Sequence, residues 1–264
     1  MQEAVIVEKV GKKDFVAINL EFTNKNLSKN LPELYLYYKL RVWSAPTAGW
    51  IKDFVYTKNE KYNILPNLIK LGWISVDGKK VNKYRDVVAN CGCKSRVTAD
   101  ITAYELCDIE TFKGYVIAIN EKYLLDKKDR INKRIKTSLA KGKPIPSSWT
   151  KLKGATQIEL VTKKTKEDGV VTITGRAFND ELSRLMGLSV ATITRWRAIS
   201  NNNSFNSYEL RNVRVNADHK SKATKMVVED RQYKGSVFST KRDGTIIMTK
   251  DLLITSGIKL FYGV

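Results

Sequence analysis

Two segments near the start of the chain, residues 4–10 and 15–22, alternate apolar and polar side chains, and each predicts a β-strand. The apolar residues over 31–43 are dense enough for a buried helix, and the run GYVIAIN over 114–120 predicts a buried strand. Strands and helices therefore share the first half of the chain, which indicates an α+β fold.

A further helix is predicted from Lys58 with an interruption at Pro66, because a proline inside a helix removes one hydrogen bond and clashes with the preceding turn. The apolar run that follows reaches Ile74 and leads into Asp77 and Gly78, a pair that suits a type I′ turn. This pattern predicts a helix that runs into a two-stranded hairpin.

The second half of the chain shows a similar mixture of elements. Strands are expected at IELVTKK and VVTITG, on either side of a turn at Asp168-Gly169, and at ELRNVRV after an Asn-rich turn. Alternating runs that predict hairpins near the end of the chain span residues 225–228, 235–240 and 245–249.

Residues 177–200 contain two helical segments separated by a glycine. Asn179 or Asp180 can cap the first helix. Its apolar face comprises Leu182, Leu185 and Met186. Gly187 tolerates the positive φ of a tight turn, and Ser189 can cap the second helix by accepting a backbone N–H bond.

In the second helix, Ile193 and Trp196 are three residues apart and are expected to face inward. The side chains expected to face outward are Val190, Ala191, Thr194, Arg195 and Arg197. The pattern resembles the helix-turn-helix of bacterial and phage regulators, whose recurring positions are filled here by Ser183, Gly187, Ser189, Ile193 and Trp196. This resemblance implies that the second helix enters the major groove of DNA. A surface helical hairpin with a glycine corner is the alternative.

A second resemblance covers residues 58–85, where a helix, Gly-Trp-Ile, a turn and a basic strand are similar to the last helix and wing of winged-helix domains. It implies that the start of the helix lies near the major groove, with Asn59, Lys61, Tyr62 and Asn63. It also implies that the wing contacts phosphates through Lys79, Lys80, Lys83 and Arg85. An ordinary packing element with a solvated hairpin is the alternative.

The 47 Lys and Arg residues outnumber the 27 Asp and Glu residues and leave a net charge of +20, which favours a polyanionic partner. Charge alone fits DNA, RNA or an anionic membrane, and the helix-turn-helix pattern favours duplex DNA. The basic run over 122–153 includes Lys133 and Arg134 and predicts a helix leading into an extended linker. The linker could track phosphates, or it could be a solvated charged face.

The expected organisation is two α+β domains, winged-helix-like or helix-turn-helix, with β-hairpins and a basic linker between them. The boundaries are an N-terminal domain over 1–125, a basic helix and linker over 126–154, and a C-terminal domain over 155–264. Neither a signal peptide nor a run of about 20 apolar residues is recognisable, so the protein is expected to be soluble and cytoplasmic without a membrane partner.

Several kinds of chemistry lack the residues they need. The single histidine, His219, excludes initiators and relaxases that hold a metal with paired histidines. The three cysteines, Cys91, Cys93 and Cys107, lack a fourth nearby ligand and are expected to be free thiols, which fits a reducing compartment. No Gly-Lys-Ser/Thr follows a glycine-rich loop, so no nucleotide cofactor is expected. With the histidine and cysteines as described, no metal cofactor is expected either.

The sequence therefore predicts a non-enzymatic, sequence-specific binder of double-stranded DNA, and a phage or plasmid replication initiator is the first expectation. A transcription regulator is the alternative, and replication or transcription machinery would be a further partner. Other classes are a recombinase or nuclease, with Tyr262 as a late candidate nucleophile, and an RNA-binding protein. The residues expected to bind DNA are Ser189, Val190, Ala191, Thr192, Thr194, Arg195, Arg197, Lys79, Lys80, Lys83, Arg85, Lys133, Arg134, Lys241 and Arg242.

Overall fold

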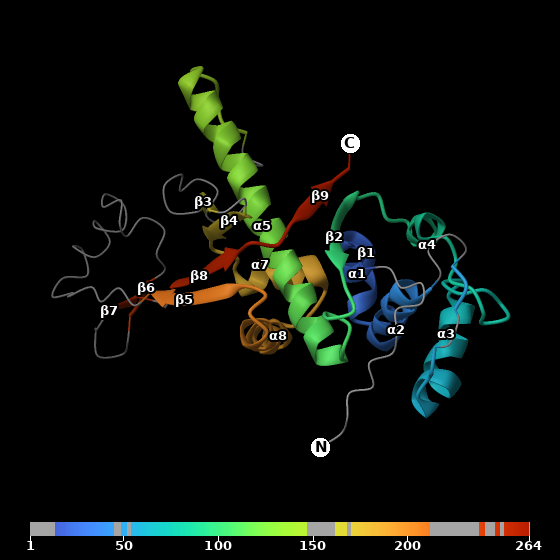
Figure 1. Cartoon of the computed structure of the whole chain (residues 1–264). Helices are drawn as coiled ribbons and strands as arrows, with labels where there is room; N and C mark the ends of the chain where they lie inside the picture. Colours follow the sequence, from blue (N-terminus) through green and yellow to red (C-terminus); the bar gives the residue numbers. More distant parts are fainter. Residues whose placement is uncertain are drawn as a thin grey trace. The chain divides into compact units, whose positions relative to one another are not determined.

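The computed structural model of the chain mixes helices and antiparallel sheets, which confirms the predicted α+β fold (Figure 1). The residues described are 14–44, 49–51, 54–146, 162–167, 170–211, 238–240, 246–248 and 251–263. The chain divides into two units, of which the first comprises Met1–Tyr115, Met186–Leu188 and Lys259–Val264, and the second Val116–Leu185 and Ser189–Ile258. The first boundary lies inside one long helix, α5 (Ile109–Ala140), which therefore contributes to both units.

The first unit contains a three-stranded antiparallel sheet in the order β1 (Val16–Asn19), β2 (Val97–Ile101), β9 (Leu260–Tyr262). The predicted strand over 15–22 is confirmed only as far as Asn19, where helix α1 (Leu20–Leu27) begins. Asn19 ends the strand because its side chain caps α1, accepting the Phe22 N–H at 2.9 Å. The strand predicted over 4–10 lies outside the described residues.

Helix α2 (Leu31–Trp43) is the buried helix that the apolar run predicts. Leu34, Leu36, Tyr37, Tyr38 and Leu40 are all fully enclosed. The rings of Tyr37 and Tyr38 belong to an aromatic core, in which Phe22 packs against Trp73 with 5.0 Å between ring centroids. This core supports the hairpin that begins at Trp73.

The helix predicted from Lys58 begins there and continues to Lys70, as η1 (Glu60–Ile64) followed by α3 (Leu65–Lys70). Thr57 and Glu60 form a capping box, because the Glu60 carboxylate accepts the Thr57 N–H and the Thr57 hydroxyl accepts the Glu60 N–H. The predicted interruption at Pro66 takes the form of a π-helical turn just before it. The wider turn accommodates a residue that has no N–H to donate and a ring that clashes with an ordinary α-turn.

A hairpin follows the helix, with isolated bridges between Ile74 and Val81 and between Trp50 and Lys80. Residues 79–81 therefore lie between residues 73–75 and residues 49–51. The Gly78 N–H donates to the Ser75 carbonyl at 2.8 Å, so the turn is centred one residue before the predicted Asp77-Gly78 pair. Helix α4 (Tyr84–Asn90) comes directly after the hairpin.

The strand predicted over 114–120 is wrong, because these residues belong to α5. Val116, Ile117, Ala118 and Ile119 are all fully buried, so this stretch of the helix is enclosed on every side. A continuous apolar run has no amphipathic period, and a strand and a buried helix segment then look alike in sequence. The predicted basic helix is confirmed as the C-terminal half of α5, which ends at Ala140.

The second unit contains a four-stranded antiparallel sheet in the order β3 (Thr162–Glu167), β4 (Val170–Gly175), β8 (Asp251–Ser256), β5 (Ser207–Arg211). Helices α7 (Asn179–Met186) and α8 (Val190–Asn202) connect β4 to β5. Strands β6 (Phe238–Thr240) and β7 (Ile246–Met248) pair as a separate hairpin, as their alternation predicts. The segments 147–161 and 225–228 lie outside the described residues.

Candidate nucleic-acid interface

The turn between α7 and α8 has the geometry that the sequence predicts. Gly187 adopts a φ of 65°, and a Cβ added there would meet nothing within 4 Å, so backbone conformation alone accounts for the glycine. Ser189 caps α8 by accepting the Thr192 N–H at 3.2 Å. Gly187 and Ser189 therefore account for the tight turn and for the start of the second helix.

The inward-facing side chains of the two helices are also as predicted. Leu182 and Met186 of α7 and Ile193 and Trp196 of α8 are buried. The predicted cap of α7 by Asn179 or Asp180 is wrong, because these are the first two helical residues, and the Asn179 amide donates to the Thr194 hydroxyl of α8 at 3.3 Å. At the start of α7 the Glu181 carboxylate accepts the Phe178 N–H at 3.1 Å, which is one half of a capping box.

The prediction that Arg197 faces outward is wrong. Only 8% of its surface is exposed, and its Nε donates to Glu121 Oε1 of α5 at 2.5 Å. Its two terminal nitrogens donate to the Asn179 side chain and to the Ala177 carbonyl. All three guanidinium nitrogens are thus occupied within the fold, because position 197 falls one residue beyond Trp196 on the side of α8 that meets α5. The Arg197 side chain is therefore not available to a ligand.

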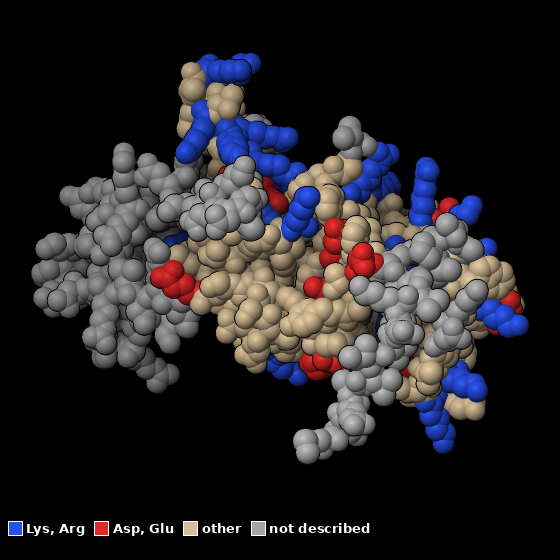
Figure 2. Space-filling model, viewed as in Figure 1, with Lys and Arg blue, Asp and Glu red and all other residues tan. Residues whose placement is uncertain are grey.

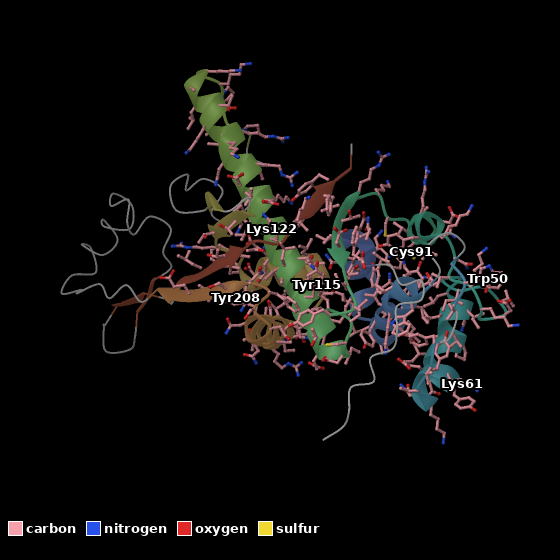
Figure 3. The ribbon with its side chains drawn as sticks, in the orientation of Figure 1. Trp50, Lys61, Cys91, Tyr115, Lys122 and Tyr208 are labelled. Carbon is pink, nitrogen blue, oxygen red and sulfur yellow. The ribbon has the colours of Figure 1, made fainter. Side chains whose placement is uncertain are left out.

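The Glu121 carboxylate organises further groups around Arg197. Its Oε2 accepts from the Asn206 amide at 2.8 Å and from the Tyr208 hydroxyl at 2.7 Å. Tyr208, labelled in Figure 3, also bonds the Ser200 hydroxyl, and burial raises the pKa of its phenol well above the usual range. The buried carboxylate therefore links α5, α8 and the start of β5.

A second buried ion pair ties α7 to the same helix. Lys128 Nζ lies 2.6 Å from Glu181 Oε2 and also donates to the Arg176 carbonyl at 2.8 Å. Burial lowers the pKa of the Lys128 amino group from its usual 10.5, although Glu181 opposes that effect. Residues 121 and 128 are seven positions apart, so they share one face of α5. The seven-residue spacing could have indicated in the sequence that both residues lie on one helix face. The prediction of a strand over 114–120 made the predicted helix begin too late for that spacing to be noticed.

With its inner side fixed, α8 presents a continuous exposed face. The exposed residues from the cap onward are Ser189, Val190, Ala191, Thr194, Arg195, Ala198, Asn201 and Asn202. Thr192 is half-buried, and its hydroxyl bonds the Ser189 hydroxyl at 2.9 Å. The outward prediction is confirmed for Val190, Ala191, Thr194 and Arg195.

Strands frame this helix pair in a defined order. Strand β4 precedes α7, strand β5 follows α8, and β8 pairs with both of them and lies between them in the sheet. The chain between β5 and β8 includes the β6–β7 hairpin. Lys241 and Arg242, predicted to form a basic tip there, lie outside the described residues.

The C-terminal half of α5 carries a dense set of cations, visible as the blue cluster over that helix in Figure 2. Its exposed basic residues, with the turn that follows, are Lys127, Arg130, Lys133, Arg134, Lys136, Lys141 and Lys143. Lys133 pairs with Asp129 at 3.0 Å. Lys127, Arg130 and Arg134 are three and four positions apart, so they form one row along the helix.

In the first unit, the predicted wing residues Lys79, Lys80, Lys83 and Arg85 are all exposed on the hairpin and the start of α4. Lys80 Nζ lies 5.7 Å from the ring centroid of Trp50, which is 44% exposed (Figure 3). On the preceding helix, Asn59, Lys61, Tyr62 and Asn63 are exposed as well. The hairpin and the helix thus both present basic side chains to solvent.

No family model, curated protein or solved structure matches this chain. Within the described residues, no group of three or more His, Cys, Asp or Glu side chains is placed to hold a metal ion. The three cysteines are free thiols. No helix in the described ranges has both the length and the apolar character needed to cross a membrane.

Proposed function

We propose that this protein binds double-stranded DNA sequence-specifically, with α8 in the major groove. The observation that carries the proposal is the exposed face of α8, which a glycine turn and two buried ion pairs hold in a fixed position relative to α5. A recognition helix needs this combination, because base edges are read only when the helix axis is fixed to within a fraction of an ångström.

The order of elements supports a winged-helix form for the second unit. After α5 come β3 and β4, then α7 and α8, and then β5, the β6–β7 pair and β8. Strand β8 pairs with both β4 and β5, as the last strand of a winged helix does, and β3 is an additional strand at the edge of the sheet next to β4. In such a domain the chain between the last two strands is the wing. Lys241 and Arg242 fall in that segment, and we assign them to phosphate contacts.

The first unit supports a second, smaller module of the same kind. Helix α2, residues 49–51, the helix over 58–70 and the hairpin follow one another in a related order, with one helix before the hairpin where the second unit has α7 and α8. Residues 79–81 are bridged both to residue 50 and to residue 74. Lys79, Lys80, Lys83 and Arg85 would contact the backbone from this hairpin. Lys133 and Arg134, on α5, would add phosphate contacts that do not depend on sequence.

Base reading falls to Arg195. Its side chain is exposed and lies 3.5 Å from the Thr192 hydroxyl at one terminal nitrogen, so its guanidinium can reach the O6 and N7 acceptors of guanine. Two DNA-binding modules in one basic chain fit a replication initiator that binds repeated sites in an origin. A transcription regulator would share this chemistry but would be expected to bind an isolated palindrome.

The test is selection of bound duplexes from a randomised library at near-physiological salt, with wild-type protein and two variants. Wild type should enrich a defined motif, and spaced direct repeats of it would support origin binding. Arg195→Ala should weaken binding to that motif by about 1 to 3 kcal/mol and relax the choice of one base. Arg184→Ala is the matched control, because Arg184 is exposed on α7 and should affect all sequences alike. Absence of any enriched motif would overturn the proposal.

A further inference from the structure

The exposed face of α8 differs in character from the rest of this basic chain. Lys and Arg make up 47 of the 264 residues, yet Arg195 is the single cation on this face, because Arg197 is buried. A surface that served phosphate binding would be rich in lysine and arginine, as the end of α5 is. The α8 face is therefore suited to a neutral part of the ligand.

Apolar atoms occupy the first turns of this face. Val190 stands at the first position of α8 with 47% of its surface exposed, and Ala191 beside it is exposed as well. The Thr194 hydroxyl donates to the Val190 carbonyl at 3.0 Å and accepts from the Asn179 amide at 3.3 Å. Its methyl group is then the part of the side chain that remains for a ligand.

Small residues continue the same stripe along the helix. Ala191 and Ala198 are seven positions apart, which is about two turns, and both are exposed. Neither has atoms beyond Cβ, so the backbone of α8 can approach a flat surface closely. A close approach is needed for methyl contacts because dispersion attraction falls steeply beyond van der Waals distance.

We propose that Val190, Ala191 and the Thr194 methyl group recognise the 5-methyl groups of thymine in the major groove. This proposal rests on the proposed function and names what the remainder of the α8 face reads. Thymine is the one base that presents an apolar group on its major-groove edge. The recognised site therefore contains thymines next to the guanine read by Arg195.

The experiment replaces single thymines by uracil in the duplex recovered by the library selection, which removes one methyl group and leaves base pairing intact. Loss of one contacted methyl should weaken binding by about fourfold, the equivalent of burying one methyl-sized group. Uracil at thymines outside the motif is the control and should have no effect. Val190→Thr, which keeps the shape but replaces a methyl with a hydroxyl, should reduce the penalty at one thymine position and leave the others unchanged.

The outcomes separate this inference from the function on which it rests. A defined motif whose affinity is indifferent to uracil at every position, or a motif without thymine, would overturn methyl reading and leave sequence-specific binding intact. If no motif emerges, both fail. Urea unfolding of Val190→Thr should match wild type, because Val190 is exposed and its side chain is not part of the core.

Discussion

Arg197 Nε lies 2.5 Å from Glu121 Oε1, which ties the candidate recognition helix to α5 through a buried ion pair. The Glu121 side chain is fully enclosed, and the Arg197 side chain is almost entirely buried. The same carboxylate also accepts bonds from Asn206 and Tyr208 on its other oxygen, so both carboxylate oxygens are hydrogen-bonded. The pair positions α8, and the exposed residues of that helix are left for a ligand.

This ion pair predicts that two arginines of α8 differ in their contribution to the free energy of unfolding. Arg197→Ala leaves the Glu121 carboxylate buried without its partner, and it should lower the free energy of unfolding by about 3 to 5 kcal/mol. Arg195→Ala removes an exposed side chain and should change it by less than about 0.5 kcal/mol. Urea unfolding followed by circular dichroism measures both. Equal stability of the two variants would contradict a structural role for Arg197.

Gly187 allows a test of the turn without steric complication. Alanine at this position meets no neighbouring atom, so Gly187→Ala should cost only the strain of a positive φ, about 1 to 2 kcal/mol. Gly187→Asn should be tolerated better, since asparagine adopts the left-handed region more readily. Thermal unfolding of the three proteins provides the measurement. A φ of 65° would be ruled out if alanine proved as stable as glycine.

Asp108 should make the free energy of unfolding decrease at acid pH. Its carboxylate caps α5, and the backbone hydrogen bond from Thr111 at 2.7 Å is the main cause that holds its pKa below the usual 3.8. Because the folded pKa lies below the unfolded one, the cap contributes its full stabilisation above about pH 4. That contribution is lost as pH falls further, through the folded pKa.

The measurement is urea unfolding of wild type and Asp108→Asn between neutral pH and pH 2. Asparagine can still cap the helix but does not titrate, so the wild-type advantage should shrink as the solution is acidified. A constant difference between the two proteins at every pH would show that Asp108 has the same pKa folded and unfolded.

The basic end of α5 predicts a change in salt dependence. Arg134 is exposed, and we expect Arg134→Ala to weaken binding to all duplexes alike and to reduce the slope of log K against log salt by about 1. Lys133→Ala should behave similarly but more weakly, because Lys133 already pairs with Asp129 at 3.0 Å. Lys29→Ala, an exposed lysine between α1 and α2, is the control and should leave the slope unchanged.

Local chemistry in the sequence determined the elements of the candidate interface. Gly187 ends α7, Ser189 caps α8, and Ile193 and Trp196 mark the inner face of the second helix. Each of these depends on residues within about one helical turn, where propensity and spacing are informative. Helix α2 and the hairpin after Gly72 were predictable for the same reason.

Only the tertiary structure decided which charges serve the fold. In sequence, Arg195 and Arg197 are equivalent cations of one helix, and Lys128 belongs to a basic run. Burial separates them, because Glu121 and Glu181 occur 76 and 53 residues away from their partners and meet them only once α5 packs against α7 and α8. Residues 116–119 are buried on every side of α5, and the continuous apolar run that this burial requires concealed their helical period. Local patterns specify helices and turns, whereas the energetic role of a charge depends on partners that packing brings together over a long distance along the chain.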